Sequence, residues 1–125
     1  MVYDRITSPD RIVWNISPAE TDGAVTARGV VPVGSTWFDG HFPSVRILPG
    51  VAQLAMVAEI LKETLGRAVS VTHLSRVRFK SAIHPGDEVT VEIKPKAGSS
   101  SAYAFQISRR DEPSSSGLLT IAGEG

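Results

Sequence analysis

Apolar residues follow two different periodicities along this chain, and the change between them separates the predicted elements. Alternating and β-branched residues predict strands over residues 11–17 and 24–33. Residues 49–65 are apolar on nearly every side, with Gln53 and Glu59 among the few polar positions, and this pattern predicts a buried helix. Gly66 follows the last apolar residue, where helices commonly end. Such a helix must be covered by other elements, and the rest of the chain predicts only strands.

After residue 66 the apolar period becomes two, which predicts further strands over residues 71–80, 88–94, 103–107 and 118–122. Residues 110–117 are expected to form a loop. In the strand over 71–80 one face is predicted to carry Val71, His73, Ser75, Val77 and Phe79, and the other Leu74, Arg76, Arg78 and Lys80. His73 is expected in the core or at an interface. The predicted fold class is α+β: a six-stranded, mainly antiparallel curved sheet wrapped around one central helix, in a single domain over residues 1–125.

Composition excludes several classes of function. The chain has 13 basic and 13 acidic residues, so its formal net charge is zero and no nucleic-acid partner is expected. It has no cysteine, which excludes a disulfide framework, a thiolate zinc site and a cysteine nucleophile. Its three histidines lack nearby carboxylates, so neither a metal site nor a cofactor is expected. No run of residues is apolar enough for a membrane span or a signal peptide, and we expect a cytoplasmic protein that does not bind membranes.

The candidate chemistry lies where the loop over residues 32–48 leads into the helix. His41 is on this loop, and a histidine is a suitable base near neutral pH. Pro49 suits the first position of a helix, and Gly50 allows close approach to the backbone. The free N–H groups at a helix start form a donor site for an oxyanion or a polarised carbonyl. The turn that carries His41 is also expected to contain a cis peptide bond between Phe42 and Pro43.

Two blocks of residues resemble a known family. The stretches Phe38-Asp39-Gly40-His41-Phe42-Pro43 and Ile47-Leu48-Pro49-Gly50-Val51 resemble the active-site signature of the hot-dog-fold 3-hydroxyacyl-acyl-carrier-protein dehydratases. Downstream, Val77-Arg78-Phe79-Lys80 and Pro85-Gly86-Asp87-Glu88-Val89 resemble that family's second block. The segment Pro49-Gly50-Val51-Ala52-Gln53-Leu54 is most similar to the branch associated with aryl-polyene-type pigment synthesis.

The resemblance implies a dehydratase of fatty-acid or polyene synthesis that acts on 3-hydroxyacyl thioesters as a homodimer or higher homo-oligomer. By this resemblance His41 would abstract the C2 proton, and the Gly50 amide would hold the thioester carbonyl. A carboxylic acid from the neighbouring subunit would protonate the departing hydroxyl. The residues expected to contact the substrate are Phe42, Leu48, Val51, Gln53 and Leu54.

The acid position departs from the family pattern. Ala55 stands where the family carries Glu or Asp, and alanine cannot transfer a proton. Glu59, one helical turn further on, is a candidate replacement, although its neighbours Lys62 and Glu63 favour the solvated end of the helix. We therefore expect weak activity from the isolated chain, or a heterodimer with a related subunit that supplies the acid.

The remaining interpretations concern partners and competing functions. Arg76, Arg78 and Lys80 are candidates for binding an acyl carrier protein or the phosphates of CoA, or they form an ordinary solvated face. A hot-dog thioesterase would need a carboxylate to activate water, and Asp39 is the candidate near the helix start. A non-catalytic subunit that binds acyl thioesters is the third possibility, and Ala55 favours it.

Overall fold

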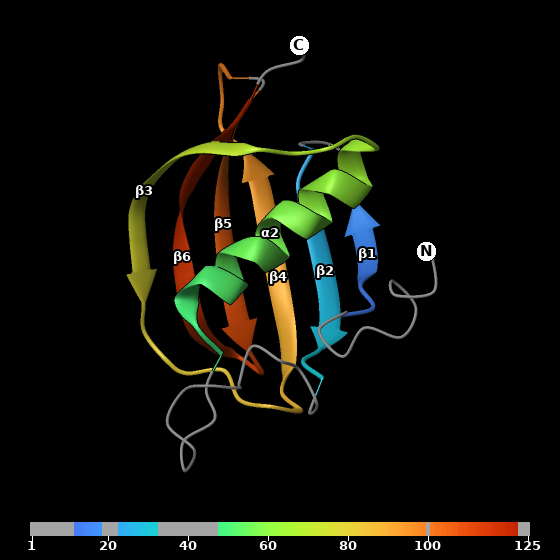
Figure 1. Cartoon of the computed structure of the whole chain (residues 1–125), viewed down its shortest axis with the longest axis vertical. Coiled ribbons are helices and arrows are strands. Elements are labelled where there is room, and N and C mark those ends of the chain that lie inside the picture. The colour runs from blue at the N-terminus through green and yellow to red at the C-terminus, as the bar shows by residue number, and fades with distance from the viewer. Residues whose placement is uncertain (1–11, 19–22, 33–47, 100, 123–125) are drawn as a thin grey trace.

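The computed structural model describes residues 12–18, 23–32, 48–99 and 101–122. Its elements, in chain order, are β1 (Asn15–Pro18), β2 (Val25–Val30), α2 (Gly50–Leu65), β3 (Val71–Phe79), β4 (Glu88–Pro95), β5 (Ala102–Arg109) and β6 (Glu112–Ile121). The strands form one sheet in the order β1-β2-β4-β5-β6-β3, and every neighbouring pair is antiparallel. Helix α2 crosses one face of this curved sheet (Figure 1). The predicted α+β class is confirmed, with a six-stranded sheet and one helix in the residues that the structure describes.

Helix α2 has the predicted start and end. Pro49 is its N-cap, with an extended backbone and no side-chain cap. Gly66 ends the helix in the left-handed conformation at φ 70°, and its N–H donates to the Lys62 carbonyl at 2.9 Å. Glycine adopts this conformation without the steric cost that a Cβ adds. The sequence therefore predicts the position of the helix well.

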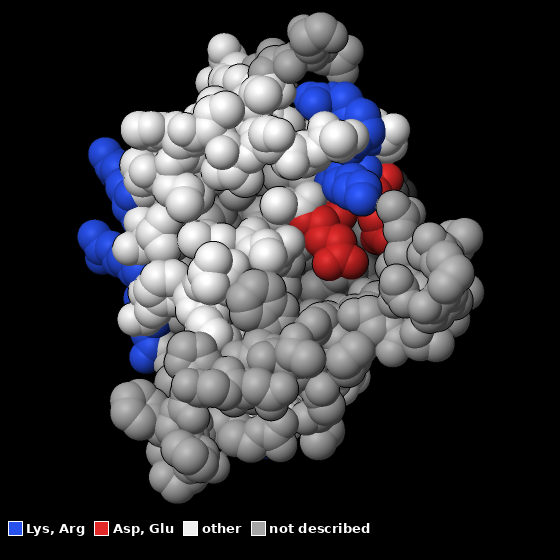
Figure 2. Space-filling view, viewed as in Figure 1, with Lys and Arg blue, Asp and Glu red and all other residues white. Residues whose placement is uncertain are grey.

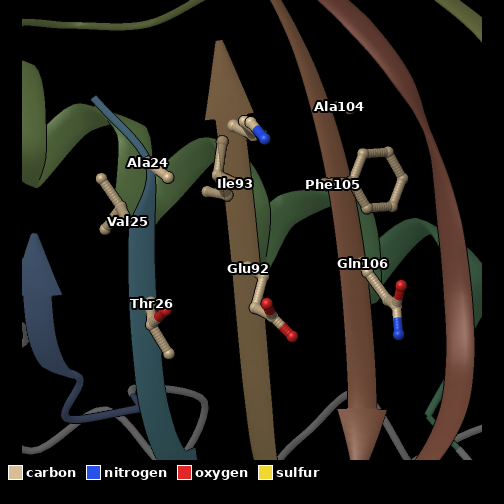
Figure 3. A pocket seen from close by; sticks show the side chains of 9 residues that line it. Ala24, Val25, Thr26, Glu92, Ile93, Ala104, Phe105 and Gln106 are labelled. Atoms are coloured by element: carbon tan, nitrogen blue, oxygen red, sulfur yellow. The ribbon is translucent and has the colours of Figure 1, made fainter. Parts of the chain in front are cut away.

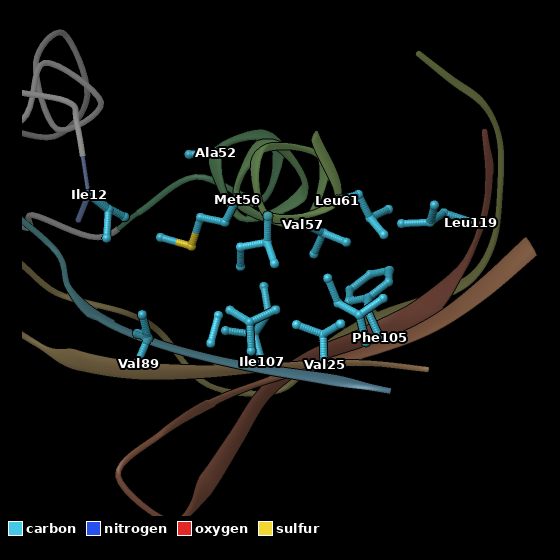
Figure 4. Packing of buried hydrophobic residues seen from close by; sticks show 14 of the residues in the cluster. Ile12, Val25, Ala52, Met56, Val57, Leu61, Val89, Phe105, Ile107 and Leu119 are labelled. Carbon is cyan, nitrogen blue, oxygen red and sulfur yellow. The ribbon is translucent and has the colours of Figure 1, made fainter. Parts of the chain in front are cut away.

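The hydrophobic core lies between α2 and the sheet. Met56, Val57 and Leu61 project from the helix toward Val25, Phe105 and other sheet residues (Figure 4). The β4 residues that face the helix alternate with outward polar residues, as expected for a sheet with one covered face. Burial against the sheet therefore fixes the orientation of the helix and of its start at Gly50.

Strand β3 lies at the edge of the sheet and does not keep the predicted alternation. One bulge lies between Val71 and His73 and another between Ser75 and Arg78, where Arg76 has a positive φ of 55°. As a result Leu74 and Phe79, predicted on opposite faces, pair with Leu119 and Ser115, which face the same side of β6. The predicted faces of this strand are therefore wrong. His73 is exposed rather than part of the protomer's core.

Strand β6 begins earlier than predicted. The expected loop over residues 110–117 is a short turn at Arg110 and Asp111, and the three serines from 114 to 116 belong to the strand. Ser114 and Ser115 are buried, and the Ser114 carbonyl accepts the backbone N–H of Lys80 at 2.8 Å. Serine is small enough to pack inside a strand that pairs with both neighbouring strands. A cluster of serines is more typical of turns, so the sequence does not reveal this strand. The first strand was also predicted too early, because pairing with β2 starts only at Asn15.

Candidate active site

The start of α2 presents backbone donors. The N–H groups of Ala52 and Gln53 donate to the Pro49 carbonyl at 3.0 and 3.2 Å. Among the described residues, no acceptor is found for the N–H groups of Gly50 and Val51. Such unpaired groups at a helix start attract negative charge or a polarised carbonyl oxygen. Within the described residues, these two N–H groups are therefore candidates for the donor site expected at Gly50.

Gly50 is also required for packing. A Cβ built on Gly50 would lie 2.6 Å from Cζ of Phe79 and 3.0 Å from its Cε1. Separations this short are repulsive, so a larger residue would displace the ring or the helix start. The packing role and the donor role of Gly50 are compatible, because one uses the α-carbon and the other the amide.

An open pocket of about 380 Å³ lies beside this helix start. The residues that line it are Leu48, Pro49, Gly50, Gln53, Phe79, Lys80, Ser81 and Ala82. The structure therefore brings together Gly50 with two of the predicted substrate contacts, Leu48 and Gln53. Phe79 was not predicted as a site residue, because the bulges that turn its ring toward α2 leave no periodic signal in the sequence.

Gln53 is an unusual member of this pocket. It is only 3% exposed, and its Oε1 has no hydrogen-bond partner among the residues that the structure describes. A buried acceptor without a partner typically costs about 1–3 kcal/mol. The backbone of Leu48, another residue of this pocket, is held in place because its N–H donates to the Ile83 carbonyl at 2.7 Å.

Other predicted residues on α2 lie away from the pocket. Val51 is 62% exposed and Ala55 is exposed, so both lie on the side of the helix that faces away from the sheet. Leu54 packs, partly buried, against the core. Glu59 is partly exposed and lies about 13 Å along the helix axis from Gly50, given a rise of about 1.5 Å per residue. Within one protomer, Glu59 is therefore not brought to the Gly50 pocket.

The loop that carries the predicted base lies outside the described residues. This applies to His41, to Phe42 and its bond to Pro43, and to Asp39. Their predicted roles stay predictions.

The turn before β4 is held by Asp87. Its Oδ2 accepts the backbone N–H of His84 at 2.7 Å and lies 3.6 Å from Nε of Arg109 on β5. Arg109 also donates from Nη2 to Glu112 at 3.1 Å. The Pro85-Gly86-Asp87 block thus joins the turn to the neighbouring hairpin. It is a structural contact that does not line the pocket beside Gly50.

The basic residues of β3 lie along the edge of the sheet. Arg76, Arg78 and Lys80 are all exposed, and Figure 2 shows basic side chains projecting from this edge, beside an uncharged surface that extends over β3 and the first part of α2. They do not form the regular row that was predicted, because Arg76 lies in the bulge. Lys80 also lines the pocket beside Gly50, which connects the basic edge with the candidate site.

A second pocket lies on the face of the sheet opposite α2. Its volume is about 350 Å³, and side chains of β2, β4 and β5 line it, including Thr26, Glu92 and Gln106 (Figure 3). None of the predicted site residues belongs to it. In the described part of the chain, no group of three or more potential metal ligands occurs. No helix found there has the length and hydropathy needed to cross a membrane.

Comparison with known proteins identifies the family. Residues 17–118 match the family described as ApeI-like, with the description ApeI dehydratase. The 3-hydroxyacyl-acyl-carrier-protein dehydratase FabZ of Caldicellulosiruptor bescii is 33% identical over 110 residues, which cover 77% of this chain and 74% of that protein. FabZ of Streptococcus mutans is 30% identical over 111 residues, which cover 82% and 79% of the two chains.

Solved structures share the fold. The dehydratase heterocomplex ApeI:P from Xenorhabdus doucetiae matches with a TM-score of 0.77 and 21% identity, over 90% of this chain and 98% of that one. A hypothetical thioesterase with coenzyme A from Streptococcus pneumoniae matches with a TM-score of 0.65 and 13% identity, over 98% and 94%. The hot-dog fold is thereby confirmed. The thioesterase likeness shows the fold alone, whereas the sequence matches point to dehydratases. The chain therefore belongs to the ApeI-like dehydratase family.

Proposed function

We propose that this protein interconverts 3-hydroxyacyl and enoyl thioesters of an acyl carrier protein. The observation that supports this most strongly is the start of α2, where Gly50 lines an open pocket and its amide has no acceptor among the described residues, in a chain of the dehydratase family. FabZ relatives are named as acting on the carrier-bound 3-hydroxyacyl group. A CoA thioester carries the same acyl linkage and is the alternative substrate form.

The reaction needs a base, an oxyanion donor and an acid. In our proposal His41 removes the proton from C2 while the Gly50 amide stabilises the negative charge that develops on the thioester oxygen. The electron pair left on C2 forms the C2–C3 double bond, and the C3–O bond breaks. The hydroxyl gains a proton and leaves as water.

This chain has no acidic residue at position 55, where the resemblance places the catalytic acid. Ala55 lies on the exposed side of α2, where a second subunit could pack. Val51 on that side and Phe79 on β3 are large exposed apolar residues, at 62% and 53%. Apolar surface of this kind is typical of an interface. We propose that the protein forms a dimer through α2 and β3. With a second copy of this chain, Glu59 or water would act as the acid and turnover would be slow. With a related subunit, that subunit would supply the carboxylate.

The carrier protein is proposed to dock at the basic edge of β3. Arg76, Arg78 and Lys80 would meet its acidic surface or the phosphate of its pantetheine arm. Lys80 lines both this edge and the pocket beside Gly50. The arm would therefore enter the pocket from this side.

The test is hydration of an enoyl thioester by the wild-type protein and by His41→Ala. We expect slow conversion to the 3-hydroxyacyl thioester by the wild type. Loss of a catalytic base typically lowers the rate by about 10²- to 10⁴-fold, so His41→Ala should be inactive in practice. Conversion that persists in His41→Ala would contradict the assigned base.

The same assay separates the alternative functions. Release of free thiol that depends on Asp39 would indicate a thioesterase. Thioester binding without any turnover, alone or with a related subunit, would indicate a binding protein. Either result would overturn the proposed dehydratase activity.

A further inference from the structure

Gln53 differs from the other buried residues of α2 because it is polar. The others are Ala52, Met56, Val57, Ile60 and Leu61. Gln53 lies about one helical turn after Gly50, lines the same pocket, and has a buried Oε1 without a partner in the described part of the chain. An apolar residue would fill this position without leaving a polar atom unpaired. The carboxamide is therefore unexplained by the fold of the protomer.

The chemistry of a carboxamide limits what could bind it. Its oxygen accepts hydrogen bonds and its nitrogen donates them, and a half-turn of the last side-chain torsion exchanges the two atoms. A hydroxyl group satisfies either orientation because it both donates and accepts. Ser81 also lines the pocket, but its hydroxyl is 2.9 Å from the Pro113 carbonyl and 3.1 Å from Ser114 Oγ. The protein itself therefore supplies no evident partner in the described residues.

The spacing along α2 fits one kind of ligand. In a 3-hydroxyacyl thioester only C2 separates the carbonyl carbon from the carbon that bears the hydroxyl. Gly50 and Gln53 are three residues apart, which separates them by about 4.5 Å along the helix axis. We infer that Gln53 binds the 3-hydroxyl of the acyl group while the Gly50 amide holds its carbonyl, so that the pocket selects hydroxyl-bearing thioesters. This inference rests on the proposed function.

The experiment compares two ligands and two matched substitutions. Binding of a 3-hydroxyacyl pantetheine thioester and of the saturated thioester without the hydroxyl is measured for the wild type, Gln53→Met and Gln106→Met. Methionine has nearly the length of glutamine but forms no comparable hydrogen bond. Gln106 lies exposed on the opposite face of the sheet and serves as the control.

We expect the wild type and Gln106→Met to prefer the hydroxyl-bearing thioester. In Gln53→Met this preference should fall by about three- to tenfold, which is the change in affinity that the loss of one hydrogen bond typically causes. The melting temperature of Gln53→Met should equal or exceed that of the wild type, because an unpaired buried polar group has been removed. Gln53→Leu provides a second apolar variant with the same expectation.

Three results would overturn the inference. Equal loss of affinity for both thioesters in Gln53→Met would show that the hydroxyl is not the bound group. An unchanged preference together with a lower melting temperature would show that Gln53 has a structural role. Failure of the wild type to bind either thioester would overturn the proposed function itself, and this pattern differs from the other two.

Discussion

The ring of Phe79 lies against the α-carbon of Gly50, so the edge strand β3 and the start of α2 meet within the candidate active site. Gly50→Ala would place its Cβ 2.6 Å from the ring. Because the Phe79 ring is 53% exposed and has room to shift, we expect a loss of about 1 kcal/mol in the free energy of unfolding, the lower end of the usual cost of overpacking, together with reduced activity. Urea denaturation and the hydration assay measure the two effects.

A second substitution shows whether crowding is the cause. Phe79→Leu makes room for the new methyl group, so Gly50→Ala with Phe79→Leu should be less destabilised than the sum of the single variants. A Gly50→Ala protein as stable as the wild type would contradict the described contact.

Asp87 should contribute more to stability than the neighbouring surface ion pair. Asp87→Ala leaves the His84 N–H and the buried Arg109 Nε without their carboxylate. The side chain of Asp87 is 13% exposed, and we expect a loss of about 1–3 kcal/mol in the free energy of unfolding. Glu112→Ala, which removes the exposed partner of Arg109, should cost at most about 1 kcal/mol. Equal effects in urea denaturation would contradict this ranking.

Charge reversal at β3 should weaken binding to the carrier protein. Arg78 is exposed at the sheet edge, and Arg78→Glu replaces attraction with repulsion. Arg28→Glu is the matched control, because Arg28 is exposed on β2, away from that edge. We expect Arg78→Glu to raise the dissociation constant by about tenfold or more at low salt, and less at high salt. If Arg28→Glu has the same effect, the carrier protein does not dock specifically at β3.

Ala55→Glu should restore a proton donor at the family's acid position. If a homodimer places this residue opposite His41 of the other subunit, the rate of hydration should rise by about 10²-fold or more, which is the usual contribution of a general acid. The same substitution in a His41→Ala background should give no gain. An unchanged rate in Ala55→Glu would count against an otherwise complete dehydratase site and would favour the binding protein.

The sequence predicted the helix well because its signals are local. Pro49, the apolar run and Gly66 each act on the residues beside them, and the helix begins and ends where they indicate. Strand β3 was predicted with the wrong faces because its bulges arise from pairing with distant β6, where Arg78 lies opposite Ser116. Serines 114 to 116 suggested a loop, whereas tertiary packing places them in a strand.

The distinction between local signals and contacts distant in the sequence also applies to the candidate site. The motif around Gly50 led to the prediction of two residues that line its pocket, Leu48 and Gln53, because both are close to it in the sequence. Phe79 and Ser81 reach the pocket only through the folding of β3 beside α2, so no local pattern indicated them. Lys80 was predicted to bind the carrier protein and not to line this pocket.

The most direct test of the proposed activity is to identify the products formed from a 3-hydroxyacyl-carrier thioester by mass spectrometry. Our account predicts an equilibrium with the enoyl thioester, a mass lower by one water, with the thioester bond intact. Because the chain has Ala55 at the acid position, we expect this conversion to be slow for the wild type and faster for Ala55→Glu. Appearance of free carrier thiol and the hydroxy acid, without any enoyl thioester, would contradict it.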